Sequence, residues 1–245
     1  MSDSIYHIKL DAIDSTNDYL KKLALEDTTN NFTFVTAKNQ TNGKGQRGTV
    51  WQSEKGKNLT MSILIKNITI QPADLFYCNV IVSCSLLQFL SDYDLKCTVK
   101  WPNDIMADSK KITGILIENV FKANGEINAI IGIGLNVNQT HFHSLPNATS
   151  MKNQAQQDFD VEQLAQNIVL KIQSNWKKIS SHSRFFWEYY HDHLFKKGIP
   201  AAFEDKKGNK FMGIIQEVSP DGKLVVVDEN EKKVPFDLKQ IKLLF

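Results

Sequence analysis

Hydrophobic positions recur along this chain with two different periods. Over residues 59–66 apolar residues alternate with mostly polar ones, and this period of two predicts a β-strand. The stretch from Leu75 to Leu90 is apolar at most positions, which predicts a buried helix. Residues 14–18 contain a serine followed three residues later by an aspartate, a pattern typical of a helix start. Further strands are predicted over residues 5–10 and 32–37.

Strands also dominate the middle of the chain. Residues 98–101 predict a short strand that Pro102 ends. Longer apolar runs over residues 112–118 and 127–137 predict two more strands. The dipeptide Asn124-Gly125 lies between them and favours a tight hairpin turn.

The last third changes from helix to short strands. An amphipathic pattern over residues 161–179, preceded by Asp160 as a cap, predicts a long helix. A second helix is predicted over residues 183–196, ending at Gly198. Beyond it, turn dipeptides separate short strands at Gly208-Asn209, Asp221-Gly222 and Glu229-Asn230. We therefore expect two domains, residues 1–197 and a small β-module over residues 198–245.

Composition narrows the class of protein. The 245 residues include 29 basic and 27 acidic side chains, so the net charge of +2 gives no sign of a nucleic-acid or membrane partner. Three cysteines, with no CxxC pair, suit a reducing compartment and offer no zinc or disulfide framework. The N-terminal residues show no signal peptide, and no apolar run is long enough to span a membrane. A cytoplasmic protein is expected.

A glycine-rich segment stands out within the polar region 38–58. Residues 43–48 match the pattern GxGxxG, but no helix pattern follows, as a dinucleotide site would require. A Walker A loop is also excluded, because no Gly-Lys-Ser/Thr sequence ends the segment. Two interpretations stay open: a flexible surface loop, or a mobile loop that brings Lys44 and Arg47 to an anion.

Three further segments carry candidate chemistry. Residues 100–104, Lys-Trp-Pro-Asn-Asp, cluster polar side chains at a strand end, although a lone aspartate is more often a turn residue. In residues 110–118 a lysine pair precedes a strand whose Gly114 indicates the close approach of a ligand or another backbone. The two glycines of residues 132–138 leave one strand face bare, so something must occupy it, and Asn136 has an amide suited to a purine edge.

Taken together and in this order, these motifs resemble those of one family. Ser15-Thr16-Asn17 and the segments 43–51, 100–104, 111–118 and 132–138 are similar to the motifs of biotin protein ligases, also called biotin–[acetyl-CoA-carboxylase] ligases. The resemblance extends over about residues 5–245. It implies an α+β fold, with a mixed β-sheet and flanking helices related to class II aminoacyl-tRNA synthetases, plus a small SH3-like β-barrel.

The resemblance also implies an activity. Biotin and ATP would be the substrates, with Mg²⁺, and would form biotinoyl-5′-AMP and pyrophosphate. A lysine of a biotin carboxyl carrier domain, part of a biotin-dependent carboxylase, would then take the biotinoyl group and release AMP. Some relatives carry an N-terminal DNA-binding domain; this chain starts almost directly at the ligase region, so no specific DNA binding is expected. A homodimer is a further possibility that short relatives suggest.

Site residues follow from the same resemblance. The implied catalytic residues are Lys111, Arg47 and Lys44. The implied biotin-binding residues are Ser15, Thr16, Asn17, Gln40, Gly43, Lys44, Gly45, Gln46, Lys111 and Gly114. The implied ATP- and adenylate-binding residues are Arg47, Trp51, Lys100, Asn103, Asp104, Gly134 and Asn136. Asp104 is also a candidate ligand for Mg²⁺.

The glycine-rich loop departs from the family pattern, which has more arginines. Lys44, Gln46 and Thr49 stand where arginines are usual, so Arg47 is the one arginine of the loop. A lysine supplies charge without the bidentate fork, and glutamine and threonine supply no charge. Two alternatives remain beside biotin ligation: a lipoate or octanoate ligase of the same fold, and a non-enzyme, either a cofactor-binding regulator or an inactive interaction module.

Overall fold

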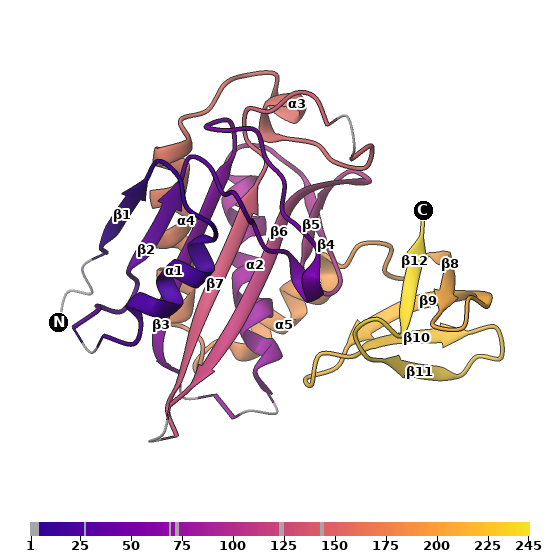
Figure 1. Ribbon diagram of the computed structural model, residues 1–245. Coiled ribbons are helices and arrows are strands. Elements are labelled where there is room, and N and C mark those ends of the chain that lie inside the picture. Colours follow the sequence, from indigo (N-terminus) through magenta and orange to yellow (C-terminus); the bar gives the residue numbers. More distant parts are fainter. Residues whose placement is uncertain (1–4, 27, 69, 72–73, 123–124, 143–144) are drawn as a thin grey trace.

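Two β-sheets organise the chain, in the computed structural model that describes residues 5–26, 28–68, 70–71, 74–122, 125–142 and 145–245 (Figure 1). The larger sheet has seven strands in the order β1-β2-β3-β7-β6-β5-β4. Its strands are β1 (His7–Leu10), β2 (Phe34–Ala37), β3 (Leu59–Ile68), β4 (Cys97–Lys100), β5 (Asp104–Ala107), β6 (Lys110–Phe121) and β7 (Ile127–Leu135). β1 pairs with β2 in parallel and the other pairs are antiparallel, which confirms the mixed sheet.

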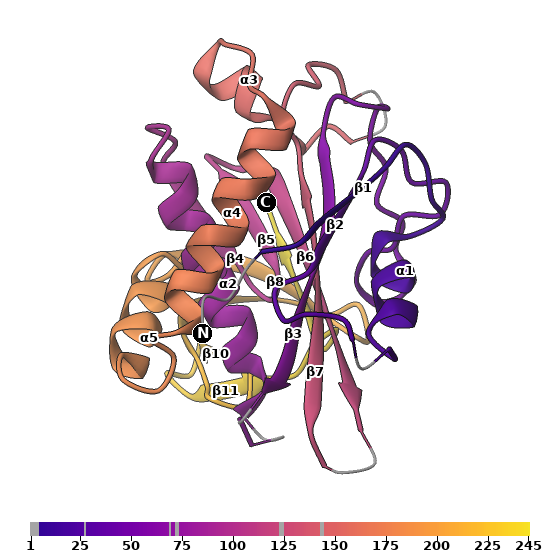
Figure 2. The same cartoon turned by 90° about the vertical axis from the view of Figure 1, so that its left-hand side faces the viewer.

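Helices cover both faces of this sheet. They are α1 (Thr16–Leu23), α2 (Phe76–Ser91), α3 (Met151–Ala155), α4 (Val161–Trp176) and α5 (Ser183–Asp192). Figure 2 shows α1 on one face and α2 with α4 on the other. α2 is buried over most of its surface, between the sheet and α4 and α5, and forms the centre of the main hydrophobic core.

Local capping explains where the helices begin. Ser15 accepts a hydrogen bond from the backbone N–H of Asp18, and Asp160 accepts from the N–H groups of Glu162 and Gln163. These contacts satisfy N–H groups that have no partner inside the helix. Both predicted helix starts are confirmed. The long helix ends at Trp176, and the next at Asp192, four residues before the predicted end.

Several strand predictions need correction. β3 is buried on both faces over residues 59–65, because α1 covers the face that carries its polar side chains. β5 was not expected, and it begins at Asp104, directly after a turn formed by residues 101–103. β6 extends from Lys110 to Phe121, further than predicted at both ends. The predicted hairpin joins β6 and β7, although Asn124 lies outside the described residues.

The smaller sheet contains the C-terminal strands. They are β8 (Pro200–Asp205), β9 (Lys210–Val218), β10 (Leu224–Asp228), β11 (Lys233–Phe236) and β12 (Ile241–Leu244), in the antiparallel order β11-β10-β9-β8-β12. Gly208 and Gly222 adopt positive φ angles of 83° and 87° in the predicted turns. Over the described part of the chain, no helix is long and apolar enough to cross a membrane.

Candidate functional site

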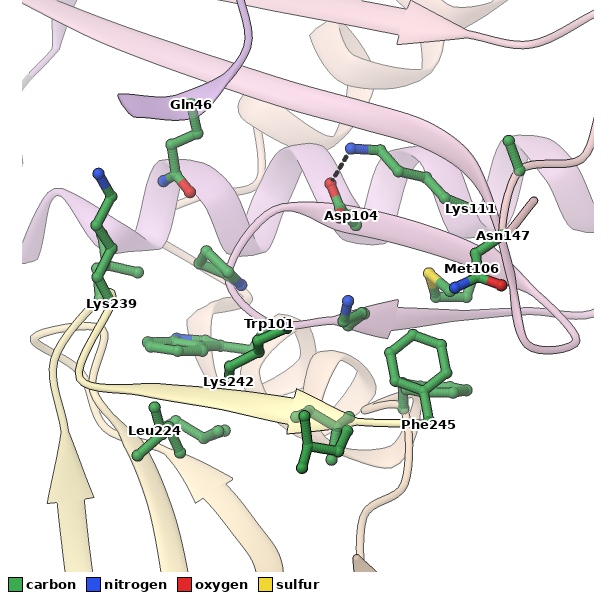
Figure 3. A pocket seen from close by; sticks show the side chains of 18 of the residues that line it. Gln46, Trp101, Asp104, Met106, Lys111, Asn147, Leu224, Lys239, Lys242 and Phe245 are labelled. Carbon is green, nitrogen blue, oxygen red and sulfur yellow. Dashed lines mark ion pairs between the residues drawn. The ribbon is translucent and has the colours of Figure 1, made fainter. Parts of the chain in front are cut away.

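Two adjoining cavities lie beside the antiparallel strands of the larger sheet. The smaller, about 280 Å³, is enclosed by α1, the loop of residues 43–51, and strands β6 and β7. The larger, about 860 Å³, lies between β4 and β5 on one side and β12 of the smaller sheet on the other (Figure 3). Trp51, Asp104 and Lys111 line both cavities. The two cavities therefore meet at these side chains.

Glycines on β6 and β7 make room in the smaller cavity. A Cβ added to Gly132 would lie 2.4 Å from Oδ1 of Asn17, and one added to Gly134 would lie 2.3 Å from Cε2 of Trp51. A Cβ added to Gly114 would lie 3.1 Å from Nζ of Lys111. The expectation that something fills the bare face is confirmed: side chains of this chain fill it, and the glycines let them approach the sheet.

A buried polar cluster closes one end of the smaller cavity. Oε1 of Gln40 accepts hydrogen bonds from the backbone N–H and the hydroxyl of Thr16, at 2.8 and 2.9 Å. Oγ of Ser62 lies 2.8 Å from Oγ1 of Thr16 and 2.5 Å from Oδ1 of Asn17. The Nδ2 group of Asn17 donates to Glu118 at 2.7 Å. Because these groups hold one another in place, they present a fixed set of donors and acceptors to a polar ligand.

Lys111 forms an ion pair at the junction of the cavities. Its Nζ lies 2.6 Å from Oδ1 of Asp104 and 5.6 Å from the centroid of the Trp51 ring. The backbone N–H of Lys111 donates to the carbonyl of Asn147, which fixes the start of β6. About a third of the lysine side chain is exposed. The ammonium can therefore reach an anion in either cavity.

The glycine-rich loop folds back on itself beside α1. Gly45 N–H donates to the carbonyl of Thr49 at 2.7 Å, and Trp51 N–H to the carbonyl of Gly43 at 2.9 Å. Nζ of Lys44 lies 2.5 Å from a carboxylate oxygen of Asp18, and this hydrogen bond raises the pKa of Lys44. Mobility of the loop without ligand stays a prediction.

The backbone of Arg47 lies in a 3₁₀ turn, Gln46–Gly48, at the tip of this loop. Its side chain lies outside the described part of the structure, so its expected role stays a prediction. The side chain of Gln46 lines both cavities. The loop therefore brings an uncharged amide to the junction, at a position where the resemblance implied an arginine.

Lysines from both sheets line the larger cavity. Lys100 on β4 lies 4.6 Å from the centroid of the Phe245 ring, and burial lowers the pKa of Lys100. Lys239 and Lys242 belong to the C-terminal segment (Figure 3). Among the described residues that line the cavity, Asp104 is the one acidic side chain. This excess of positive charge suits a polyanionic ligand.

The structure brings most of the predicted site residues together. The smaller cavity is lined by the predicted residues Ser15, Thr16, Asn17, Gln40, Lys44, Gly45, Gln46, Trp51, Asn103, Asp104, Lys111, Gly114 and Gly134. Lys100 and Asn136 line the larger cavity, where the Nδ2 group of Asn136 donates to the carbonyl of Thr149. Gly43, at the start of the loop, lines neither cavity; an added Cβ there would be 2.5 Å from the Trp51 carbonyl oxygen, and its expected biotin contact stays a prediction.

Sequence reasoning missed several residues. Asp18, Ser62 and Glu118 support the predicted site residues through hydrogen bonds, and Lys239 and Lys242 line the larger cavity. The polar residues that alternate along β3 were a usable signal for Ser62, since a hydroxyl on a buried strand needs a partner. Nothing in the sequence pattern connects the C-terminal lysines to the site.

Asp104 is the one carboxylate that the sequence assigned to a metal. No group of three or more His, Cys, Asp or Glu side chains is suitably placed for a metal ion among the residues that the structure describes. Asp104 itself is paired with Lys111. These residues therefore do not form a metal centre made by the protein alone.

Comparisons with protein families and with known proteins show what this chain is similar to. The model of the "Biotin/lipoate A/B protein ligase family" matches residues 10–138. The chain is 29% identical over 197 residues to "Bifunctional ligase/repressor BirA" of Bacillus subtilis, a match that covers 76% of this chain and 58% of that relative. It is 21% identical to "Biotin--[acetyl-CoA-carboxylase] ligase" of Mycobacterium tuberculosis, over 77% of this chain and 70% of the relative.

A solved structure extends the likeness to the whole fold. The biotin protein ligase of Aquifex aeolicus, in complex with biotin and ATP, superposes with a TM-score of 0.79 at 24% identity, over 98% of each chain. At this identity the match shows the fold, including the two-sheet arrangement. The chain spans a little over half the length of the Bacillus subtilis relative.

Proposed function

This chain belongs to the Biotin/lipoate A/B protein ligase family, and we propose that it is a biotin protein ligase that uses ATP to attach biotin to a carrier lysine. The observation that carries the proposal is Lys111, placed where a polar cavity meets a cation-lined one. A ligase that joins a carboxylate to a nucleotide needs two adjoining sites and a cation between them. The named relatives and the ligands of the Aquifex aeolicus ligase support the same assignment.

Biotin fits the smaller cavity by its chemistry. The ureido ring carries two N–H donors and a carbonyl acceptor, and the cluster of Thr16, Asn17 and Gln40 offers matching polar groups. The valeryl chain then leads the carboxylate toward Lys111. A lipoyl or octanoyl group has no such polar ring and would make no matching hydrogen bonds with this cluster.

ATP fits the larger cavity, with its phosphates near the lysines. A carboxylate oxygen of biotin attacks the α-phosphorus, the P–O bond to the β-phosphate breaks, and pyrophosphate leaves with the bonding pair. The product is the mixed anhydride biotinoyl-5′-AMP. Lys111 lowers the repulsion between the two anions and stabilises the charge that develops on the phosphoryl oxygens. For this, the ammonium must exchange its contact with Asp104 for one with the substrates.

In the second half-reaction the enzyme mainly holds the anhydride where the carrier lysine can attack it. The neutral ε-amine of a carrier lysine attacks the carbonyl carbon of the anhydride, and AMP leaves. The amine loses a proton as the amide bond forms. The glycine-rich loop, with Lys44 and Gln46 at the cavity, covers the anhydride and limits its escape to water.

Finer features belong to the same proposal. If Mg²⁺ accompanies ATP, Asp104 would be the carboxylate available to it, and the ion would supply charge neutralisation for the phosphates. The C-terminal strands form an SH3-like barrel over residues 198–245, and the domain of residues 1–197 is related to class II aminoacyl-tRNA synthetases.

The carrier domain is the macromolecular partner of the enzyme. Homodimerisation is a further proposal, and the enzyme works in the cytoplasm.

Pyrophosphate exchange tests the proposed activation step directly. Labelled pyrophosphate should enter ATP only when biotin and Mg²⁺ are present. Lipoate or octanoate in place of biotin should give no exchange above background. Exchange that lipoate supports and biotin does not would assign the chain to the other branch of the family. No exchange with any of the three acids would refute the ligase proposal.

A further inference from the structure

A three-residue turn, 101–103, joins β4 to β5 beside the larger cavity. Lys100 and Asp104 flank this turn and lie opposite each other in the β4–β5 ladder. Both side chains line the larger cavity, and Asp104 forms the ion pair with Lys111. The position of the turn therefore sets the positions of two charged groups at the ATP side of the proposed site.

The larger sheet holds this turn from one direction. The carbonyl of Asn103 accepts from the backbone N–H of Ile115 at 2.9 Å, and its Nδ2 group donates to the carbonyl of Ile115 at 2.6 Å. Ile115 lies on β6, four residues beyond Lys111. These two hydrogen bonds fix the C-terminal end of the turn to the strand that carries the proposed catalytic lysine.

The smaller sheet holds the turn from the opposite direction. The indole Nε1 of Trp101 donates to the carbonyl of Gly222 at 2.9 Å. Gly222 lies in the turn between β9 and β10, 121 residues further along the chain. Among the side chains of residues 101–103, Trp101 thus provides a direct hydrogen bond to the C-terminal sheet.

Gly222 is confined on its other side as well. Its φ angle is +87°, and an added Cβ would lie 2.5 Å from Cδ2 of Phe76 on α2. The residue is buried, and its N–H donates to the carbonyl of Ser219 at 2.8 Å. The β9–β10 turn is therefore wedged between Trp101 and Phe76, at a point where only glycine fits without rearrangement.

We propose that Trp101 is a positioning residue whose hydrogen bond to Gly222 couples the seating of the C-terminal sheet to the placement of Lys100 and Asp104. The inference rests on the proposed ligase function, because its effect is on ATP. Trp101 lines the larger cavity and does not line the smaller one. Lys100 lines only the larger cavity and Asp104 lines both, so loss of the contact should weaken the use of ATP more than the binding of biotin.

The conservative variant Trp101→Phe tests this coupling. It keeps an aromatic ring and removes the N–H donor, together with part of the volume of the indole. We expect KM for ATP in pyrophosphate exchange to rise about two- to tenfold, the range for one neutral hydrogen bond, with the Kd for biotin within twofold of the parent. Trp176→Phe is the matched control, because Trp176 is half-buried at the end of α4 and lines neither cavity.

A second variant keeps the proposal testable. Gly222→Ala should also raise KM for ATP, because its Cβ would meet Phe76 and displace the turn that carries the acceptor carbonyl; the double variant should be no worse than Gly222→Ala alone. Exchange by the parent protein establishes the ligase function independently. If the parent is active and Trp101→Phe leaves KM for ATP unchanged, the coupling is refuted. It is equally refuted if Trp101→Phe weakens biotin and ATP alike, which indicates a general structural role.

Discussion

Gly134 lies directly against the indole ring of Trp51, so closely that a Cβ there would fall 2.3 Å from Cε2 of the ring. The contact brings Trp51 to the wall that the two cavities share. Nε1 of Trp51 is buried and has no hydrogen-bond partner among the described groups.

Substitution of Gly134 should displace Trp51. Gly134→Ala cannot keep the present contact, so the ring must move away from the junction. We expect KM for ATP to rise by about tenfold or more, as overpacking of a tight contact implies. Gly132→Ala is the matched comparison, because its Cβ would displace Asn17 instead. That variant should weaken biotin binding; if both variants change the same parameter, the division of ligands between the cavities is wrong.

Lys111 should dominate the activation step. Lys111→Ala should reduce biotin-dependent pyrophosphate release by about 10²-fold or more, as the loss of one group that stabilises transition-state charge implies. The exposed neighbour Lys110 provides the control, since Lys110→Ala removes a charge from the same strand without touching either cavity. Activity of Lys111→Ala within a few-fold of the parent would remove this lysine from the mechanism.

The loop should retain the adenylate less well than an arginine-rich loop. Gln46→Arg adds a charge-assisted hydrogen-bond donor at the junction, worth about 1.5–3 kcal/mol where such a bond forms. It should slow the dissociation of preformed biotinoyl-5′-AMP and reduce the labelling of an unrelated protein such as albumin. Gln163→Arg on α4, far along the chain from the loop, controls for added charge. Equal release rates in all three proteins would show that position 46 does not contact the adenylate.

kcat/KM for ATP should begin to fall at a lower pH than it would if Lys100 had the pKa of an exposed lysine. Burial lowers the pKa of Lys100, and the charged form, which prevails below that pKa, is the one that attracts phosphate. kcat/KM for ATP should therefore fall as pH rises through this lowered pKa. Lys100→Arg stays charged across the range and should move the alkaline fall to higher pH. An unchanged profile would separate Lys100 from ATP binding.

Much of the fold could be predicted because its signals are local. The cap at Ser15, the apolar run of α2 and the alternation along β3 each determine one element from nearby residues. β5 could not be predicted in this way. It has four residues, and its extended form depends on pairing with β4 and β6 on either side, which the local sequence does not encode.

Some residues of the site could also be predicted from local motifs, and others depend on tertiary structure. The motifs indicated Lys111, Asn17 and Trp51, and the glycines of β7 indicated that some group fills the bare face. Which group fills it depends on strand register and on the path of the loop, and these are tertiary properties. Lys239 and Lys242 reach the cavity only because the C-terminal sheet packs beside β4 and β5 (Figure 3).

Transfer of labelled biotin to a purified biotin carboxyl carrier domain tests the central claim most directly. With ATP and Mg²⁺, the protein should label the carrier on one lysine, and the label should be absent when that lysine is changed to arginine or when ATP is omitted. Labelled lipoate and octanoate should not be transferred to this carrier or to a lipoyl domain. Transfer of lipoate or octanoate in preference to biotin, or no ATP-dependent labelling of the carrier at all, would contradict the assignment as a biotin protein ligase.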